Sequence, residues 1–164
     1  MWVTSVIASC VTLAGIVVSY VLSKKNLEGE LRRLREQEAL TKSHDFPRRA
    51  ASLMDDIEAG MSPDELKKLL TDIYAYGSPE AIRIIVEFQE TNYRMARSEN
   101  VDPLYLISLV AVLISQLKYD LTGRTVDPEN WLRLRITDYN PSQSPIPGYI
   151  KEISKNLGIS LDYD

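Results

Sequence analysis

The sequence predicts an all-α fold with one N-terminal transmembrane helix, a charged helical stalk and a cytoplasmic bundle of four to five helices. Three observations support this prediction. Residues 1–23 contain no charged side chain and no histidine. Repeated Ser-Pro and Asp-Pro steps are typical of helix starts. No segment shows the alternation of apolar and polar residues, bounded by hairpin turns, that predicts strands.

Residues 1–23 are long and apolar enough for a membrane-spanning helix, which needs about 20 mainly apolar residues. A cleaved signal peptide is disfavoured, because no Lys or Arg precedes the run and no A-x-A-like site ends it. Flanking positive charge tends to stay cytoplasmic, so the basic collar after the run predicts an outside N-terminus and a cytoplasmic body. The collar residues are Lys24, Lys25, Arg32, Arg33 and Arg35.

Small residues spaced four apart mark a candidate packing face within this run. They are Ser5 and Ser9, and Gly15 and Ser19. Such spacing lets two transmembrane helices approach closely, although small residues are also common in membrane spans in general. The only cysteine, Cys10, lies in the same run, so no intrachain disulfide or thiolate metal site can form. This agrees with a reducing cytosolic compartment for the body.

Residues 24–45 are predicted to form the stalk, because good helix formers dominate them. Three leucines follow a 4-then-3 spacing, at Leu27, Leu31 and Leu34. The pattern continues for less than three heptads. Two interpretations stay open: a solvated helix with Glu28–Arg32 as an i,i+4 pair, or a weakly dimeric stalk. Residues 43–47 break the stalk before a proline, and the single histidine there, His44, is expected to be an exposed linker residue.

The globular domain is predicted over residues 46–158, followed by a flexible tail at 159–164. The most apolar segment of the body, residues 104–117, is 14 residues long and is expected to be a buried central helix, since a membrane span needs more. A helix over residues 79–98 is expected to turn Ile85, Phe88 and Val86 inward. Residues 141–148 are expected to be a loop before a last helix at about 149–157.

Charged residues concentrate after the central helix. They are Asp120, Arg124, Asp127, Arg133, Arg135 and Asp138. One interpretation is an acid–base or phosphate site, and the favoured one is helix capping with ion pairs. No Gly-rich phosphate loop, nucleophile elbow or HExxH pairing is present. We therefore predict no catalytic residue, no cofactor and no metal; an enzyme using Asp120, Asp127 and Asp138 is the least favoured hypothesis.

Charge is unevenly distributed along the chain, whose formal net charge is −4. Residues 24–49 hold eight Lys/Arg and five Asp/Glu, a balance of +3, and residues 50–164 hold eleven and eighteen, a balance of −7. A basic segment beside the bilayer suits anionic headgroups. An acidic body argues against a general nucleic-acid binder, because phosphate binding needs positive charge.

Three stretches carry a family resemblance: YGSPEAI at residues 76–82, QLKYDLTG at 116–123 and WLRLRITDY at 131–139. With the anchor and stalk, they resemble uncharacterised, membrane-anchored helical proteins of bacterial genomes and prophages. The resemblance covers about residues 50–140. It implies a bacterial or phage setting, and the family offers no established activity or functional residues.

The predicted function is a membrane-tethered, non-enzymatic protein-interaction or scaffold module in the bacterial inner membrane. Its partner is a protein or a second copy of the chain. The alternative is a self-oligomerising membrane effector of a phage or defence system. In that case the anchor would associate through Ser5 and Ser9 or through Gly15 and Ser19.

Overall fold

The computed structural model describes residues 2–58 and 62–160, with side chains from residue 23 onward except at positions 54, 57 and 58. Every regular element in these residues is an α-helix, and none of these residues lies in a strand. The all-α prediction is therefore confirmed for the described residues. The chain divides into two compact units, one of residues 1–39 and one of residues 40–164.

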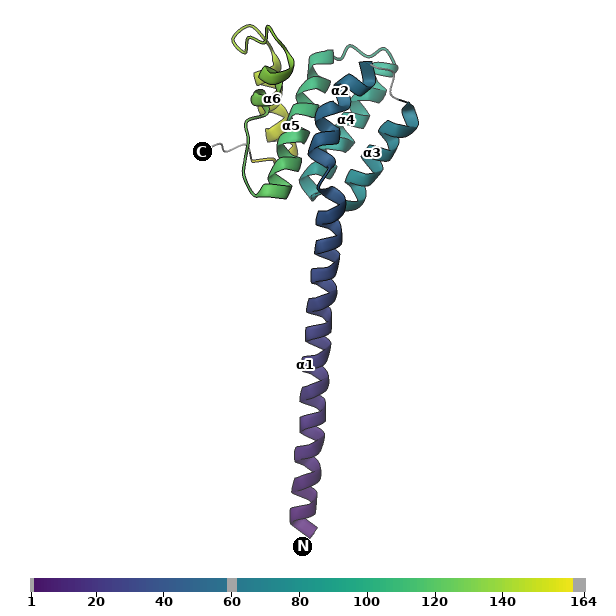
Figure 1. The fold of residues 1–164 in the computed structure, drawn as a ribbon, viewed down its shortest axis with the longest axis vertical. Helices are drawn as coiled ribbons and strands as arrows, with labels where there is room; N and C mark the ends of the chain where they lie inside the picture. The colour runs from purple at the N-terminus through teal and green to yellow at the C-terminus, as the bar shows by residue number, and fades with distance from the viewer. Residues whose placement is uncertain (1, 59–61, 161–164) are drawn as a thin grey trace. The chain divides into compact units, whose positions relative to one another are not determined.

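The first helix, α1, runs without interruption from Trp2 to Ser43 (Figure 1). Within it, Arg32 Nε lies 2.8 Å from a carboxylate oxygen of Glu36. The partner that the sequence predicts for Arg32 is Glu28. Both carboxylates lie one turn from Arg32, and the observed order of charges is the less favourable one for the helix dipole. The side chains of residues 2–22 lie outside the described residues. The predicted span and the packing face of Ser5, Ser9, Gly15 and Ser19 therefore stay predictions.

Six helices follow among the described residues of the second unit, where four to five were predicted, because two short helices each pack separately against the central one. They are α2 (Phe46–Glu58), α3 (Pro63–Tyr76), α4 (Pro79–Ala96), α5 (Pro103–Thr122), α6 (Pro128–Arg135) and α7 (Ile146–Leu157). Only His44 and Asp45 separate α1 from α2, and His44 is exposed. The predicted break and the exposed histidine are both confirmed.

Four of these helices begin with a capping side chain followed by proline, as predicted. The caps are Ser62, Ser78, Asp102 and Asp127. Ser62 Oγ accepts the N–H of Glu65 at 3.3 Å, and a carboxylate oxygen of Glu65 accepts the N–H of Ser62 at 3.0 Å. Proline fits the next position because first-turn N–H groups have no partner within the helix.

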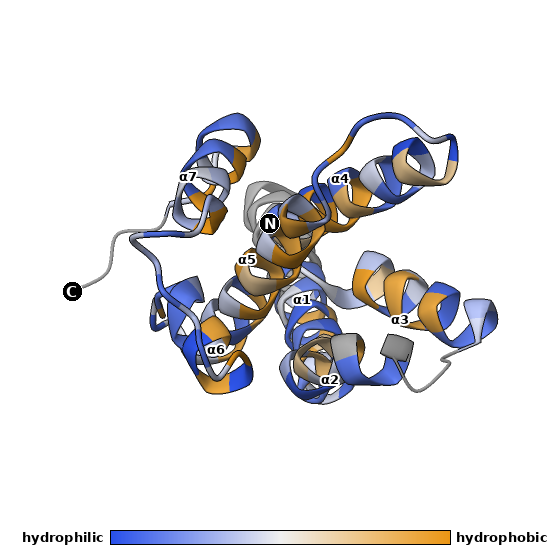
Figure 2. Ribbon diagram, turned by 90° about the horizontal axis from the view of Figure 1, so that it is seen from above, coloured by the Kyte–Doolittle hydropathy of each residue, from blue (hydrophilic) through white to orange (hydrophobic). Residues whose placement is uncertain are grey.

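Helix α5 forms the core of the second unit. It packs against α2, α4, α6 and α7, and Figure 2 shows it in the middle of these helices. Its residues from Ser108 to Leu113 are all buried, which confirms the predicted central helix. Gly123 ends it with φ 65°, a left-handed conformation that favours glycine. Among the residues with described side chains, α5 alone is long and apolar enough to cross a membrane, and 50% of its most apolar stretch is buried inside the unit.

The rotation of α4 corrects one prediction. Val86 is 48% exposed, whereas Ile84, which the sequence interpretation left out, is fully buried. The inward face of α4 is centred on Ile84, Ile85 and Phe88. Residues two apart on a helix do not share a face, so Val86 lies outside.

The end of the chain corrects two more predictions. Helix α7 begins at Ile146 rather than near Tyr149, because prolines are tolerated in a first turn and the Ile146 side chain is buried. The spacing of Trp131, Leu132 and Ile136 predicts an inner face that includes all three, but Ile136 is the C-cap residue of α6 and is partly exposed. The buried residues of α6 are Pro128 and Leu132.

Candidate functional site: the charged groove of α2 and α3

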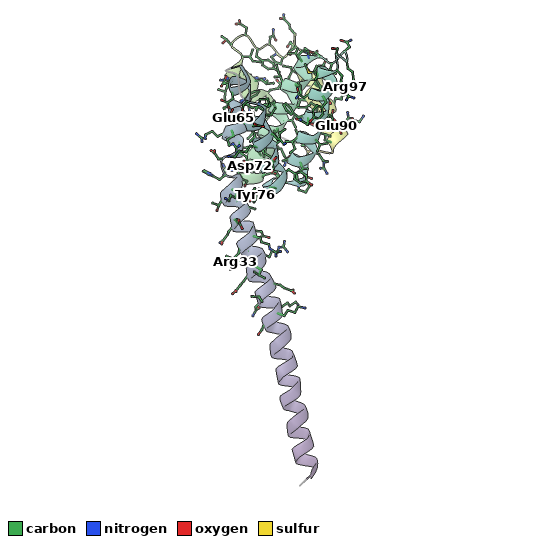
Figure 3. The ribbon with its side chains drawn as sticks, turned by 90° about the vertical axis from the view of Figure 1, so that its right-hand side faces the viewer. Arg33, Glu65, Asp72, Tyr76, Glu90 and Arg97 are labelled. Carbon is green, nitrogen blue, oxygen red and sulfur yellow. The ribbon has the colours of Figure 1, made fainter. Side chains whose placement is uncertain are left out.

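An open groove with a volume of about 930 Å³ lies along α2 and α3, next to the last turn of α1. Figure 3 shows three of its lining residues, Glu65, Asp72 and Tyr76, in a row along α3. Their spacing of seven and four residues puts them on one face of that helix. The cationic lining residues are Lys42, Arg49 and Lys68, and the anionic ones are Asp45, Asp56, Glu65 and Asp72.

The floor of the groove is apolar and belongs to the core. Phe46 from α2 and Leu69 from α3 line it, and each is only 2% exposed. Tyr76 lies at the end of α3 and keeps part of its ring in solvent. The groove therefore combines charged walls with an apolar base that is held in place by packing.

Two ion pairs organise the walls. Arg49 Nη1 of α2 lies 2.8 Å from Asp72 Oδ2 of α3, and each side chain is 32% exposed. This bond joins the two helices across the groove. At its edge, Arg48 Nε donates to Asp45 at 2.8 Å, and this hydrogen bond holds the pKa of the Asp45 carboxyl below its usual range.

The other charged residues of the groove differ in whether they already form a hydrogen bond or an ion pair. Asp56 accepts the hydroxyl of Ser52 at 2.8 Å, and Glu65 is committed to the capping box of α3. Lys42 and Lys68 form no ion pair with any described residue. These two ammonium groups are the cations that the groove can offer to a ligand.

Among the described side chains that line the groove there is no histidine, cysteine, serine or threonine. Within the described part of the chain, no three His, Cys, Asp or Glu residues are grouped to hold a metal ion. Charged walls of both signs above an apolar floor suit a peptide segment with charged and apolar side chains.

The acidic residues that the sequence singled out after α5 do not form one site. Asp120 Oδ1 accepts Gln116 Nε2 at 2.8 Å, and Asp127 caps α6 by accepting the N–H of Glu129 at 2.9 Å. Asp138 is exposed in the turn after α6. Asp127 therefore caps a helix, in line with the capping interpretation. Asp120 instead bonds within α5 through Oδ1, and its buried Oδ2 has no hydrogen-bond partner among the described residues.

Basic residues of the same region also pair locally or with a neighbouring helix. Arg133 lies 3.4 Å from Glu129, one turn away, and Arg135 of α6 forms an ion pair with Asp55 of α2. Arg124 is exposed after the end of α5. The charged constellation is thus spread over several helix ends.

The basic collar lies on α1, and all five of its side chains are exposed. Figure 3 labels Arg33 among them. At 100° per residue, the five side chains spread over about 180°, so the collar covers one half of the circumference of α1.

The groove is not among the sites that the sequence predicts. Its residues come from two segments, one ending in α2 and one within α3, that the sequence does not place side by side. A signal was present: Glu65, Lys68 and Asp72 form a charged stripe beside the apolar stripe of α3. Comparison with protein-family models, curated proteins and solved structures finds no match to this chain.

Proposed function

We propose that this chain is a membrane-tethered, non-enzymatic interaction module that holds a partner protein at the cytoplasmic face of a bacterial inner membrane. The observation that carries the proposal is a change along one helix from uncharged to charged residues. Helix α1 contains no charged residue from Trp2 to Ser23, and then begins a charged stretch at Lys24. An apolar helix of this length with a basic cytoplasmic flank is typical of a single-pass anchor.

The charge distribution supports the same orientation. The balance of +3 over residues 24–49 favours the anionic cytoplasmic leaflet. The balance of −7 over the rest of the chain gives the body no attraction to that lipid surface.

The groove supplies the contact surface in this proposal. Lys42 and Lys68 have no ion pair among the described residues, so they can bind carboxylates of a partner without breaking an existing bond. Tyr76, which is partly exposed, provides an apolar contact for a neighbouring side chain in the same groove. The partner segment is therefore expected to combine acidic and apolar residues.

Membrane insertion is tested on the full chain with a reporter at the C-terminus. We expect the chain to sediment with membranes, to resist alkaline carbonate extraction and to show reporter activity only in the cytoplasm. Extraction by carbonate would contradict the anchor. Reporter activity on the outer side would contradict the orientation.

Partner binding is tested by in-cell crosslinking of the full chain, followed by purification in detergent and mass spectrometry. The informative variant is Lys68→Glu, and its matched control is Lys67→Glu, which makes the same charge change on the same helix outside the groove. We expect one protein to crosslink to the parent and the control, and about tenfold less of it to the variant, a difference of about 1.4 kcal/mol. Equal recovery with both variants would exclude the groove as the contact surface.

A further inference from the structure

The stalk part of α1 exposes an apolar stripe. Leu27, Leu31 and Leu34 are 57%, 44% and 60% exposed. Because an α-helix turns 100° per residue, their 4-then-3 spacing puts the three side chains within about 60° of one another. Apolar residues at this spacing form the seam of a coiled coil.

We propose that a second copy of this chain covers the stripe, in a parallel two-stranded coiled coil. Leu27 and Leu34 occupy heptad position d, and Leu31 occupies position a. The inference rests on the membrane tether proposed above, and it specifies self-association as a second interaction, separate from the groove.

Charged residues beside the stripe favour a second copy of the chain as the partner and a parallel orientation of the two helices. In the same register, Glu30 occupies position g and Arg35 occupies position e. A g residue of one helix in a parallel dimer faces the e residue five positions later on the other helix. Glu30 therefore faces Arg35 of the partner subunit, and twofold symmetry repeats the pair on the other side of the seam.

Neither Glu30 nor Arg35 forms an ion pair with a described residue of its own chain. The pair that does form within the stalk, Arg32–Glu36 at 2.8 Å, occupies positions b and f on the outer face, with side chains 82% and 58% exposed. One pair of charges on the outer face thus forms within the helix, whereas Glu30 and Arg35, which flank the stripe, form no ion pair with a described residue of their own chain. This arrangement is the one that a parallel homodimer needs.

The membrane tether allows so short a seam to hold two stalks together as a dimer. Less than three heptads give only weak association between free helices. Anchored chains share one membrane with their stalks pointing the same way, which raises the effective concentration of one stalk for another. Since α1 has no break between Trp2 and Ser43, the anchor passes directly into the seam.

Disulfide crosslinking of the full chain in membranes tests the inference. The native thiol is first removed by Cys10→Ser, and one cysteine is then introduced by Leu34→Cys in the seam or by Gly29→Cys on the opposite face. The control is well matched, because a Cβ atom at Gly29 meets no atom within 4 Å. After mild oxidation with copper phenanthroline, we expect at least tenfold more covalent dimer from Leu34→Cys than from Gly29→Cys. Equal dimer from both, or crosslinking of Leu34→Cys to another protein, would overturn the proposal.

Charge reversal tests the register. Added to Leu34→Cys, Glu30→Arg puts two cations together on each side of the seam and should lower dimer crosslinking about fivefold. The further change Arg35→Glu should restore it. No effect of the first change, or no rescue by the second, would overturn the assigned pairing.

Fractionation of each sample separates this inference from the tether on which it rests. A chain that stays in membranes without Leu34→Cys-specific dimer contradicts the coiled coil alone. A chain that carbonate extracts from membranes, but that still forms this dimer, contradicts the tether alone.

Discussion

The hydroxyl of Tyr149 on α7 donates a hydrogen bond to Oδ2 of Asp102 at 2.8 Å, and this bond joins the last helix to the start of the central one. The other carboxylate oxygen of Asp102 accepts the N–H of Leu104 at 2.9 Å and caps α5. The ring of Tyr149 meets that of Tyr105 edge-on, with ring centroids 5.5 Å apart. One carboxylate thus serves a local cap and a contact between residues 47 apart in the sequence.

Replacing this carboxylate should destabilise the body. Asp102→Ala removes the cap of α5 and the acceptor for Tyr149, so we expect the free energy of unfolding to fall by about 1–2 kcal/mol. Asp102→Asn keeps a capping oxygen and should cost less. Urea unfolding of the full chain in mild detergent, followed by circular dichroism, measures both variants. Equal losses would show that the cap contributes nothing.

Alkaline pH should weaken the fold through Tyr105. Burial, with Glu87 and Glu152 nearby, raises the pKa of Tyr105 to about 12, whereas an unfolded tyrosine has a pKa of about 10. The folded protein therefore holds this proton more tightly. The stabilisation is complete below about pH 10 and is lost as the pH rises through about 12.

The measurement is the free energy of unfolding against pH for the parent and for Tyr105→Phe. The parent should lose more stability than the variant over this range. The comparison isolates Tyr105 from the lysines, which titrate in the same range in both proteins. Parallel curves would mean that Tyr105 ionises equally easily in the folded and unfolded chains.

Helix starts could be predicted from the sequence because their causes are local. A capping side chain, a proline and the first-turn acids lie within four residues, as at Ser62–Glu65. The rotation of α4 could not be predicted in the same way, because it depends on which neighbours α4 meets. The start of α7 was missed for a related reason: burial of Ile146 outweighs the loop tendency of the prolines around it.

The corrected rotation of α4 predicts a contrast between two aliphatic residues two positions apart. Ile84→Ala removes a fully buried side chain and should lower the free energy of unfolding by about 2–5 kcal/mol. Val86→Ala changes a half-exposed side chain and should stay within about 0.5 kcal/mol of the parent. The denaturant midpoints of the two variants show which of the two side chains is buried and therefore how α4 is rotated. A larger loss at Val86 would support the rotation first inferred from the sequence.

The groove was not predictable because it depends on a tertiary contact. Arg49 and Asp72 are 23 residues apart, and nothing in either helix specifies that they meet. The charged residues near Asp127 have the opposite property: their partners lie within a few residues, so their capping role could be inferred from the sequence.

The Arg49–Asp72 ion pair should contribute a measurable coupling energy. A double-mutant cycle with Arg49→Ala, Asp72→Ala and the double variant is expected to give about 0.5–1 kcal/mol, since both side chains are about two-thirds covered. The coupling should shrink in high salt, because the groove is open to solvent. A coupling near zero at low salt would mean that core packing alone holds α2 against α3.

Gly77 ends α3 where no side chain fits. Its N–H donates to the carbonyl oxygen of Ile73 at 2.7 Å, and a Cβ atom at Gly77 would lie 2.6 Å from that oxygen and 3.1 Å from Ile73 Cγ2. Ile73 is fully buried, so it cannot move away without disturbing the core. Gly77→Ala should therefore lower the free energy of unfolding by about 1–3 kcal/mol.

Gly148 in the first turn of α7 offers the matched control for Gly77. A Cβ atom there meets nothing within 4 Å, and alanine favours a helix more than glycine does. We therefore expect Gly148→Ala to raise the free energy of unfolding by about 0.5–1 kcal/mol. Thermal and urea unfolding of both variants should move in opposite directions. If both glycines tolerate alanine equally, the close approach of Gly77 to Ile73 does not constrain the end of α3.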